Sequence, residues 1–256
     1  MKVYEFGEEE NPVLLLLPGT MSYWKGNFGQ VIPELSKDFL VAVVAYTGFD
    51  EKDSCSYGSS MEEIEALEEY ITKHYGGKIL AAYGCSLGGS LVSHLVHRNH
   101  IHMKYGIIGS SDMDQAGNLK AEIMAKIIVK MMYNYIHTGK FKSKMIQKWF
   151  DKQLSDPYNR GLISMIGRDQ FDMSFITRES IKNQFKSDLT TKLPVAIDSG
   201  ETKVHVLYSK KMGKKYRQRY EKHFKNPIIH EMNLQHEELL AVYPEKWCQL
   251  IKEICN

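Results

Sequence analysis

Short apolar segments alternate with amphipathic segments along most of the chain. Seven short segments are mostly rich in Val, Ile and Leu and bounded by Gly, Pro, Ser or Asn: VYEF, PVLLLLPG, FLVAVVAY, KILAAYG, KYGIIGSS, KVHVLYS and NPIIHEMN. Continuous apolar runs of this length are typical of strands that are covered on both faces. Because helical patterns separate most of these runs, the sequence predicts an α/β fold with a mostly parallel central sheet flanked by helices.

The helical segments between the strands in several cases have recognisable ends. They are NFGQVIPELSKD, SSMEEIEALEEYITKHYGG, LGGSLVSHLVHRN, KKYRQRYEKHF and EELLAVYPEKWCQLIKEI. In the second segment, Ser60 is expected as the N-cap and Glu63 as its partner in a capping box, with Gly76 and Gly77 at the end. In the last segment, Pro244 is expected to divide the helix because proline cannot continue its hydrogen bonding.

One long region, residues 113–194, contains no convincing strand and holds amphipathic helical runs. We therefore predict an α/β core formed by residues 1–112 and 195–256, with residues 113–194 as an all-helical cap over the carboxyl edge of the sheet. Eight of the 13 methionines fall between Met103 and Met173. Because methionine fills irregular apolar space, the cap could accept an acyl chain or an aromatic group, or its methionines could simply pack the cap helices together.

A length of 256 residues, with 43% apolar and 25% charged residues, indicates a soluble globular protein with a full core. The longest apolar run is far shorter than the about 20 residues needed to cross a membrane. The start, MKVYEFGEEEN, lacks an apolar signal core, so we expect a cytoplasmic protein. The spacing of Cys55, Cys85, Cys248 and Cys255 matches neither a zinc site nor a disulfide framework. The chemistry predicted below implies no metal or organic cofactor.

Charge is unevenly distributed, although the formal net charge is only +2. Carboxylates are frequent in residues 1–70, and Lys and Arg dominate residues 203–225. A basic stretch can contact nucleic acid, but no nucleic-acid motif or stacking aromatic pattern accompanies this one. We interpret it as a solvated helix face and expect no nucleic-acid partner. The sequence leaves a homodimer open.

A serine lies between glycines where a predicted strand meets a predicted helix. The segment Gly84-Cys85-Ser86-Leu87-Gly88 has the pattern G-x-S-x-G in the strand–turn–helix context that the motif requires. The glycines permit a tight turn that presents Ser86 as a nucleophile, and the amide of Leu87 can donate to an oxyanion. Cys85 is the weaker candidate nucleophile because it lacks the flanking glycine symmetry.

A serine hydroxyl needs a base, and the last predicted loop contains one. His236 follows the final strand and precedes the C-terminal helix, so it is expected at the same edge of a parallel sheet as Ser86. His230, within the strand itself, is the second candidate base. The loop after PVLLLLPG is expected to supply a second oxyanion donor, because Gly19 allows close approach and the amide of Thr20 would face the site.

With these features, the chain resembles the α/β-hydrolase superfamily over nearly its whole length. The resemblance rests on PGT after an early strand, GCSLGG at the serine turn, the helical insertion and QHEE near the end. Within the superfamily the chain looks most like capped carboxylesterases, lysophospholipases and monoacylglycerol lipases. The resemblance implies a triad in the order Ser, acid, His, with Ser86 as nucleophile, His236 as base, and the Thr20 and Leu87 amides as oxyanion hole. Pro18 replaces the histidine that usually leads the oxyanion loop, and the backbone donor is still available.

The position of the triad acid in this chain differs from the family pattern. In most relatives it follows the penultimate strand, where this chain has Met212 in the expected position. Asp112, which follows the strand next to the serine turn, is the predicted acid, although it could instead cap the first cap helix. The sequence also leaves open Asp114, Asp198 or Glu201 as the acid, and a Ser–His dyad that has no acid.

These residues predict a serine hydrolase that acts through an acyl-enzyme on a small-molecule carboxylic ester with a hydrophobic acyl or alcohol part. The misplaced acid also fits a ligand-binding relative with weak or no turnover, since removing the acid costs about 10⁴ in turnover in a serine protease. An amidase or aminopeptidase is a third hypothesis. Against it, the cap shows no carboxylate cluster for a substrate amine.

Overall fold

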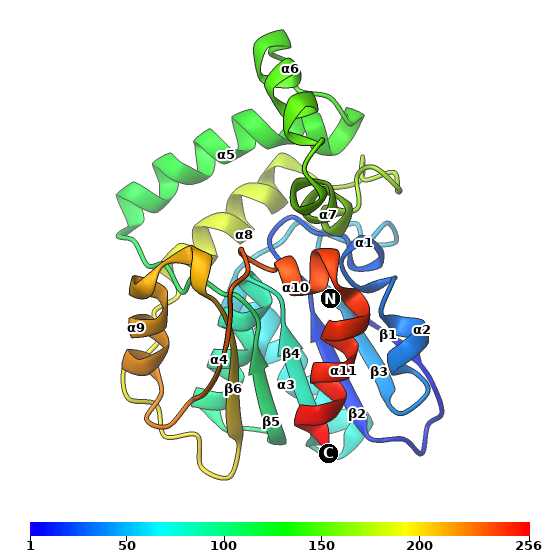
Figure 1. Cartoon of the computed structure of the whole chain (residues 1–256), viewed down its shortest axis with the longest axis vertical. Coiled ribbons are helices and arrows are strands. Elements are labelled where there is room, and N and C mark those ends of the chain that lie inside the picture. Colours follow the sequence, from blue (N-terminus) through cyan, green and yellow to red (C-terminus); the bar gives the residue numbers. More distant parts are fainter.

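The computed structural model describes all residues, 1–256, and contains one seven-stranded sheet (Figure 1). The strands are β1 (Lys2–Phe6), β2 (Val13–Leu17), β3 (Leu40–Ala45), β4 (Lys78–Gly84), β5 (His102–Ile108), β6 (Lys203–Ser209) and β7 (Ile228–Met232). Each of the seven predicted apolar segments forms one of them. The expected α/β class with a mostly parallel sheet is confirmed, because only β1 runs antiparallel to its neighbour.

The strand order, β1-β3-β2-β4-β5-β6-β7, places β4 at the centre of the sheet. The hydrogen-bond ladders continue past the strand ends, since the amide of Cys85 donates to Leu17 at 3.0 Å and that of Gly109 donates to Gly84 at 2.8 Å. The loops after β2, β4 and β5 therefore lie side by side at the carboxyl edge of the sheet.

Eleven α-helices and one short 3₁₀ helix lie between the strands or follow the last one. They are α1 (Trp24–Phe28), α2 (Ile32–Leu35), α3 (Ser60–Tyr75), α4 (Leu87–Arg98), α5 (Asn118–Thr138), α6 (Lys144–Gln153), α7 (Pro157–Ile166), α8 (Arg178–Thr190), η1 (Lys210–Met212), α9 (Lys214–His223), α10 (Glu238–Val242) and α11 (Pro244–Cys255). No helix combines the length and the apolar character that crossing a bilayer requires.

The core forms where the apolar strands meet the helices on the two faces of the sheet. Every residue of β3 is buried, as are Leu14–Leu17 of β2. Helix α11 crosses the front of the sheet in Figure 1 and α3 lies behind it. Trp247 of α11 packs edge-on against Tyr83 of β4 with ring centroids 4.7 Å apart. Burial on both faces explains why these strands read as continuous apolar runs.

Helices α5 to α8 form the insertion between β5 and β6, above the carboxyl edge of the sheet (Figure 1). No strand occurs between residues 109 and 202, in line with the absence of a strand pattern there. The division into a core and a cap at residues 113 and 194 stays a prediction.

Two local expectations need correction. Ser59, not Ser60, is the N-cap of α3, since its side chain accepts the amide of Glu62, whereas the Ser60 amide donates to the Ser187 hydroxyl at 2.6 Å. The segment 27–38 is not one helix, because it contains the end of α1 and the whole of α2, joined by a turn. The expected division at Pro244 is present, because α10 ends at Val242 and α11 begins at Pro244.

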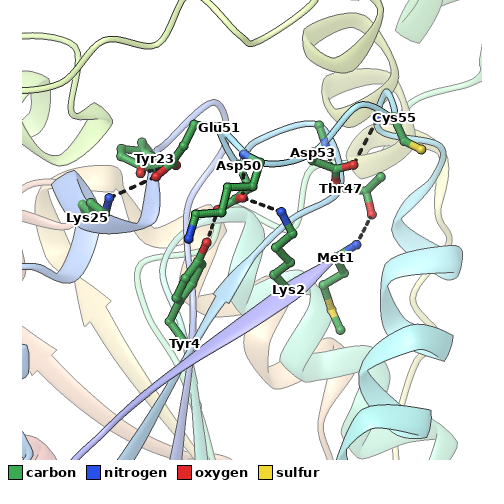
Figure 2. Close-up of polar contacts among 12 residues, drawn as sticks. Met1, Lys2, Tyr4, Tyr23, Lys25, Thr47, Asp50, Glu51, Asp53 and Cys55 are labelled. Carbon is green, nitrogen blue, oxygen red and sulfur yellow. Dashed lines mark hydrogen bonds and ion pairs between the residues drawn. The ribbon is translucent and has the colours of Figure 1, made fainter.

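Polar contacts fix the loop after β3 to the start of the chain (Figure 2). Asp50 is buried, and its carboxylate accepts hydrogen bonds from Lys2 and Tyr4, both at 2.8 Å. The neighbouring Glu51 accepts a hydrogen bond from Tyr23, the residue before α1. These contacts hold the end of the loop that connects β2 to α1, which carries Gly19 and Thr20.

Candidate active site

Ser86 lies in a sharp turn between β4 and α4. Its backbone has φ +48° and ψ −109°, a conformation that side chains rarely adopt, so the turn is strained. The glycines are required by close backbone packing. A Cβ on Gly88 would lie 2.2 Å from the Leu17 carbonyl oxygen, and one on Gly84 would lie 2.0 Å from the carbonyl carbon of Gly88. The turn thus holds Ser86 at the carboxyl edge, at the amino end of a 12-residue helix.

The amides of Leu87 and Thr20 have no hydrogen-bond acceptor within the protein. The amides on both sides of Thr20 are occupied. Gly19 donates to the Asn27 side chain and Met21 donates to the Gln184 side chain, each at 2.7 Å. The loop is therefore held from α1 and from α8, and the Thr20 amide is left available for an acceptor that is not part of the protein.

Glu237 is a buried residue that the sequence analysis did not predict as part of the site, and its carboxylate hydrogen-bonds to the serine turn. Glu237 is 4% exposed, and its Oε1 accepts the amides of Ser86 at 2.8 Å and Ser110 at 2.7 Å. Its Oε2 accepts the hydroxyl of Tyr83 at 2.9 Å. One carboxylate thus joins the last loop to the turns after β4 and β5. The sequence feature that could have indicated Glu237 is its position next to His236 in QHEE.

His236 lies in the loop between β7 and α10, one residue before Glu237. Its carbonyl accepts a hydrogen bond from the hydroxyl of Tyr158 in α7 at 3.0 Å. Neither its ring nor the hydroxyl of Ser86 hydrogen-bonds to another protein group. His230, the second candidate base, faces His205 on the neighbouring strand, with ring nitrogens 2.9 Å apart.

Among the candidate acids, Asp112 and Asp114 follow β5 and lie at the same sheet edge as Ser86. The Asp112 carboxylate accepts the amide of Asp114 at 3.0 Å, and Asp114 forms an ion pair with Arg219 at 2.5 Å. Asp112 is not the N-cap of α5, the first helix of the insertion, because that N-cap is Gly117. Neither carboxylate hydrogen-bonds to the ring of His236.

Asp198 and Glu201 precede the amino end of β6, at the opposite edge of the parallel sheet from Ser86. A seven-residue strand separates the two edges by about 23 Å. Asp198 is also exposed and pairs with Lys225 at 2.7 Å. These two carboxylates are therefore too far from the serine turn to contact a base beside Ser86.

The Cys85 thiol is poorly suited to be the nucleophile. It is buried, and burial, reinforced by the nearby Glu237 charge, raises its pKa well above the ordinary value. Because the thiolate is the reactive form, a raised pKa suppresses reactivity. Its sulfur is also 3.7 Å from the side-chain nitrogen of Asn27, the residue whose side-chain oxygen accepts the Gly19 amide.

A second acidic group lies on α8, where the insertion contacts α4. Asp188 of α8 lines a small cavity of about 20 Å³ with Ser90, His94 and Asp114. Burial, together with the charge of Asp112, raises the pKa of Asp188 to about 7. Burial also lowers the pKa of His94 to about 4, so the histidine in this cavity is neutral at pH 7.

No family model matches the chain, and no curated protein matches it. Solved structures do match. An α/β-hydrolase family protein from Desulfitobacterium hafniense shares 23% identity and a TM-score of 0.78, with all of both chains covered. A hydrolase from Pseudomonas aeruginosa PA01 shares 12% identity and a TM-score of 0.73, covering 98% of this chain and 92% of its own. A marine microorganism esterase shares 16% identity and a TM-score of 0.69, with 98% of each chain covered. The chain therefore has the α/β-hydrolase fold over its whole length.

Proposed function

We propose that this protein is a serine hydrolase that cleaves carboxylic esters with a hydrophobic acyl or alcohol part. The observation that carries the proposal is the strained turn at Ser86 together with the two unpaired amides of Leu87 and Thr20. Two amides without a protein acceptor can together donate hydrogen bonds to the oxyanion of a tetrahedral intermediate and so stabilise it. The structural neighbours that are described as an esterase, an enol-lactonase and a thioesterase support the same reaction class.

In the proposed mechanism, the hydroxyl oxygen of Ser86 attacks the ester carbonyl carbon while His236 takes the hydroxyl proton. The carbonyl oxygen becomes an oxyanion that accepts the amides of Thr20 and Leu87. Collapse of the intermediate breaks the ester bond, and His236 gives its proton to the leaving alcohol. Water, deprotonated by His236, then attacks the carbonyl carbon of the acyl-enzyme. The second intermediate breaks its bond to the Ser86 oxygen, His236 returns the proton to that oxygen, and the carboxylic acid leaves.

Asp112 is the proposed orienting acid, because it lies at the correct edge of the sheet and carries no ion pair. Its Oδ1 accepts the Asp114 amide, and in this role its Oδ2 would accept the ring N–H of His236. Glu237 has a different role in the proposal. It positions the serine turn relative to the last loop through the Ser86 and Ser110 amides, and it directly follows the proposed base His236 in the chain.

The test is hydrolysis of p-nitrophenyl esters of rising chain length by the wild type and by Ser86→Ala, His236→Ala, Asp112→Asn and Asp114→Asn. We expect activity that rises with acyl length and losses of at least about 10³ for the first two variants. Asp112→Asn is expected to lose about 10-fold or more, and Asp114→Asn to stay near wild type. Full activity of Asp112→Asn would rule out the proposed acid, and full activity of His236→Ala would rule out the base.

A second function, ligand binding with little turnover, is favoured by one observation, namely that no carboxylate contacts the His236 ring. A fluorophosphonate probe separates the two functions because it labels only an activated serine. Labelling of the wild type but not of Ser86→Ala supports the hydrolase. Absence of labelling in folded wild-type protein supports the binding protein.

A further inference from the structure

Exposed apolar side chains are concentrated on two helices of the insertion. Nine large apolar side chains of the whole chain are exposed, and six of them lie on α5 and α6. Leu119 and Met145 are 77% and 78% exposed, and Trp149 is 62% exposed. The six side chains are Leu119, Ile123, Ile127, Met131, Met145 and Trp149. Single exposed apolar residues are common, but such a concentration marks an interaction surface.

The spacing of these residues gathers them into one continuous surface. The four on α5 recur every fourth residue and form a stripe that extends about 18 Å along the helix. Ile127 and Met131 line a groove of about 840 Å³ together with Ile146 of α6. Trp149 follows Ile146 by three positions and so lies on the same side of α6. We call this set of six exposed residues and its groove the α5–α6 surface.

The same two helices and their connection are strongly basic. Residues 118–153 contain eight lysines and two carboxylates, Glu122 and Asp151. Glu122 is already paired with Lys182 and Lys186 of α8. Seven of the eight lysines form no ion pair: Lys120, Lys130, Lys140, Lys142, Lys144, Lys148 and Lys152. Their charge is therefore free to meet a negatively charged partner.

From this combination we infer that the α5–α6 surface binds to an anionic lipid bilayer. Apolar side chains that protrude this far can enter the boundary between headgroups and acyl chains, where tryptophan is especially favourable. The surrounding lysines can extend along the helices to reach anionic headgroups. In Figure 1, α5 and α6 are the outermost elements of the insertion, on the side away from the sheet, so the rest of the molecule does not obstruct a flat surface there.

Charge argues against a second copy of the chain as the occupant. A symmetric dimer through this surface would place two lysine-rich faces opposite each other, and such a pairing is repulsive. The inference does not depend on the proposed hydrolase activity, since none of the residues on this surface belongs to the candidate active site. The variant Ser86→Ala must therefore bind vesicles as well as the wild type does.

The experiment combines vesicle co-sedimentation with tryptophan fluorescence on the full chain. Vesicles of phosphatidylcholine alone are compared with vesicles of phosphatidylcholine mixed with phosphatidylglycerol, at low and at high salt. We expect binding to the mixed vesicles that weakens at high salt, because salt screens the lysines. Trp24 and Trp247 are buried, so a blue shift of the emission on binding reports Trp149.

Two sets of variants locate the binding surface. The triple change Lys142→Glu, Lys144→Glu and Lys148→Glu is expected to weaken binding to the mixed vesicles by at least about 10-fold. The single change Trp149→Ser should abolish the blue shift and also weaken vesicle binding. The matched control makes the same reversal on the basic helix α9, at Lys214, Lys215 and Lys222, which are exposed and form no ion pair. This control should bind like the wild type.

Three results would overturn the inference. The first is no co-sedimentation of folded wild type with anionic vesicles. The second is an equal loss in the α9 control, which would show that only the overall charge matters. The third is a concentration-dependent Trp149 shift without vesicles, together with a dimer in sedimentation velocity, which would make a second copy of the chain the occupant.

Discussion

At Ser86, the strained backbone is held in place by groups from several parts of the chain. Its amide donates to Glu237, the amide of its neighbour Leu87 is unpaired, and its hydroxyl has no protein partner. A non-glycine residue with φ +48° costs about 1–3 kcal/mol and persists only when its surroundings enforce it. The close packing of Gly88 on β2 and the carboxylate of Glu237 provide that enforcement.

Two substitutions at Glu237 distinguish the contribution of its hydrogen bonds to stability from the contribution of its charge to the proposed reaction. Glu237→Gln can keep all three hydrogen bonds, because its amide oxygen accepts the two backbone amides and its NH₂ can donate to Tyr83. We expect it to fold normally. Losing the negative charge should destabilise protonated His236 and move the acidic limb of the kcat/KM profile to lower pH.

Glu237→Ala leaves those donors unpaired and is expected to lose about 3 kcal/mol or more of unfolding free energy. Thermal unfolding and pH–rate profiles on an activated ester distinguish the two variants. An unchanged pH profile in Glu237→Gln, with a normal Tm, would show that the charge plays no part in the proposed reaction.

The individual elements follow from local sequence to a large extent. All seven apolar segments became strands because burial on both faces demands continuous apolar residues. Short elements were less predictable. Segment 27–38 contains the end of α1 and all of α2, and the N-cap of α3 is Ser59, one residue earlier than expected, because its side chain accepts the Glu62 amide. The amide of Ser60, the first residue of α3, donates to the Ser187 hydroxyl 127 positions away, a contact that the local sequence does not predict.

The junction of β4 and α4 gives a prediction about packing. Gly88→Ala would place a methyl group 2.2 Å from the Leu17 carbonyl oxygen, a backbone atom that cannot move without displacing β2. We expect a loss of about 3 kcal/mol or more of unfolding free energy, or failure to fold.

The matched control is Gly117→Ala at the N-cap of α5, where a Cβ meets nothing within 4 Å and φ is −69°. Its unfolding free energy should change by less than about 1 kcal/mol. Urea unfolding of both variants checks this pair, and equal stabilities would contradict the packing argument.

At the scale of the whole molecule, α8 joins the insertion to the rest of the chain through buried polar contacts. Gln184 accepts the Met21 amide, Ser187 accepts the Ser60 amide and Ser180 accepts the Tyr57 amide, at 2.7, 2.6 and 3.1 Å. The position of the loop after β2, which carries Thr20, therefore depends on the insertion as well as on the sheet. A change that loosens α8 should affect both stability and the candidate site.

Asp188 makes the stability of this junction depend on pH. Because its folded pKa is raised to about 7, the folded state favours the protonated acid. Its contribution to stability is fully present below the unfolded pKa of about 4, and is lost as the pH rises through 7. Asp188→Asn removes this dependence. We expect its Tm to exceed that of the wild type by several degrees at pH 8, and by much less near pH 4, corresponding to about 1–3 kcal/mol.

Differential scanning calorimetry across this pH range measures the effect. Asp151→Asn, on the exposed side of α6, is the control and should track the wild type at every pH. A constant Tm difference between Asp188→Asn and the wild type from pH 4 to pH 8 would contradict the raised pKa.

The sequence alone determined the strands, the fold class and the serine turn, because these depend on apolar runs and on glycines next to one another in the chain. The partners of that turn were decided by the tertiary structure. The hydrogen bonds of Glu237 to Ser86 and Ser110 join residues 151 and 127 positions apart, and no local sequence pattern predicts these contacts. The same holds for the α5–α6 surface. Its methionines suggested cap packing or a substrate cavity in the sequence, but only the packed helices show that Met131 and Met145 face outwards. Local chemistry fixes what each segment can become, whereas long-range packing decides which groups remain unpaired and exposed.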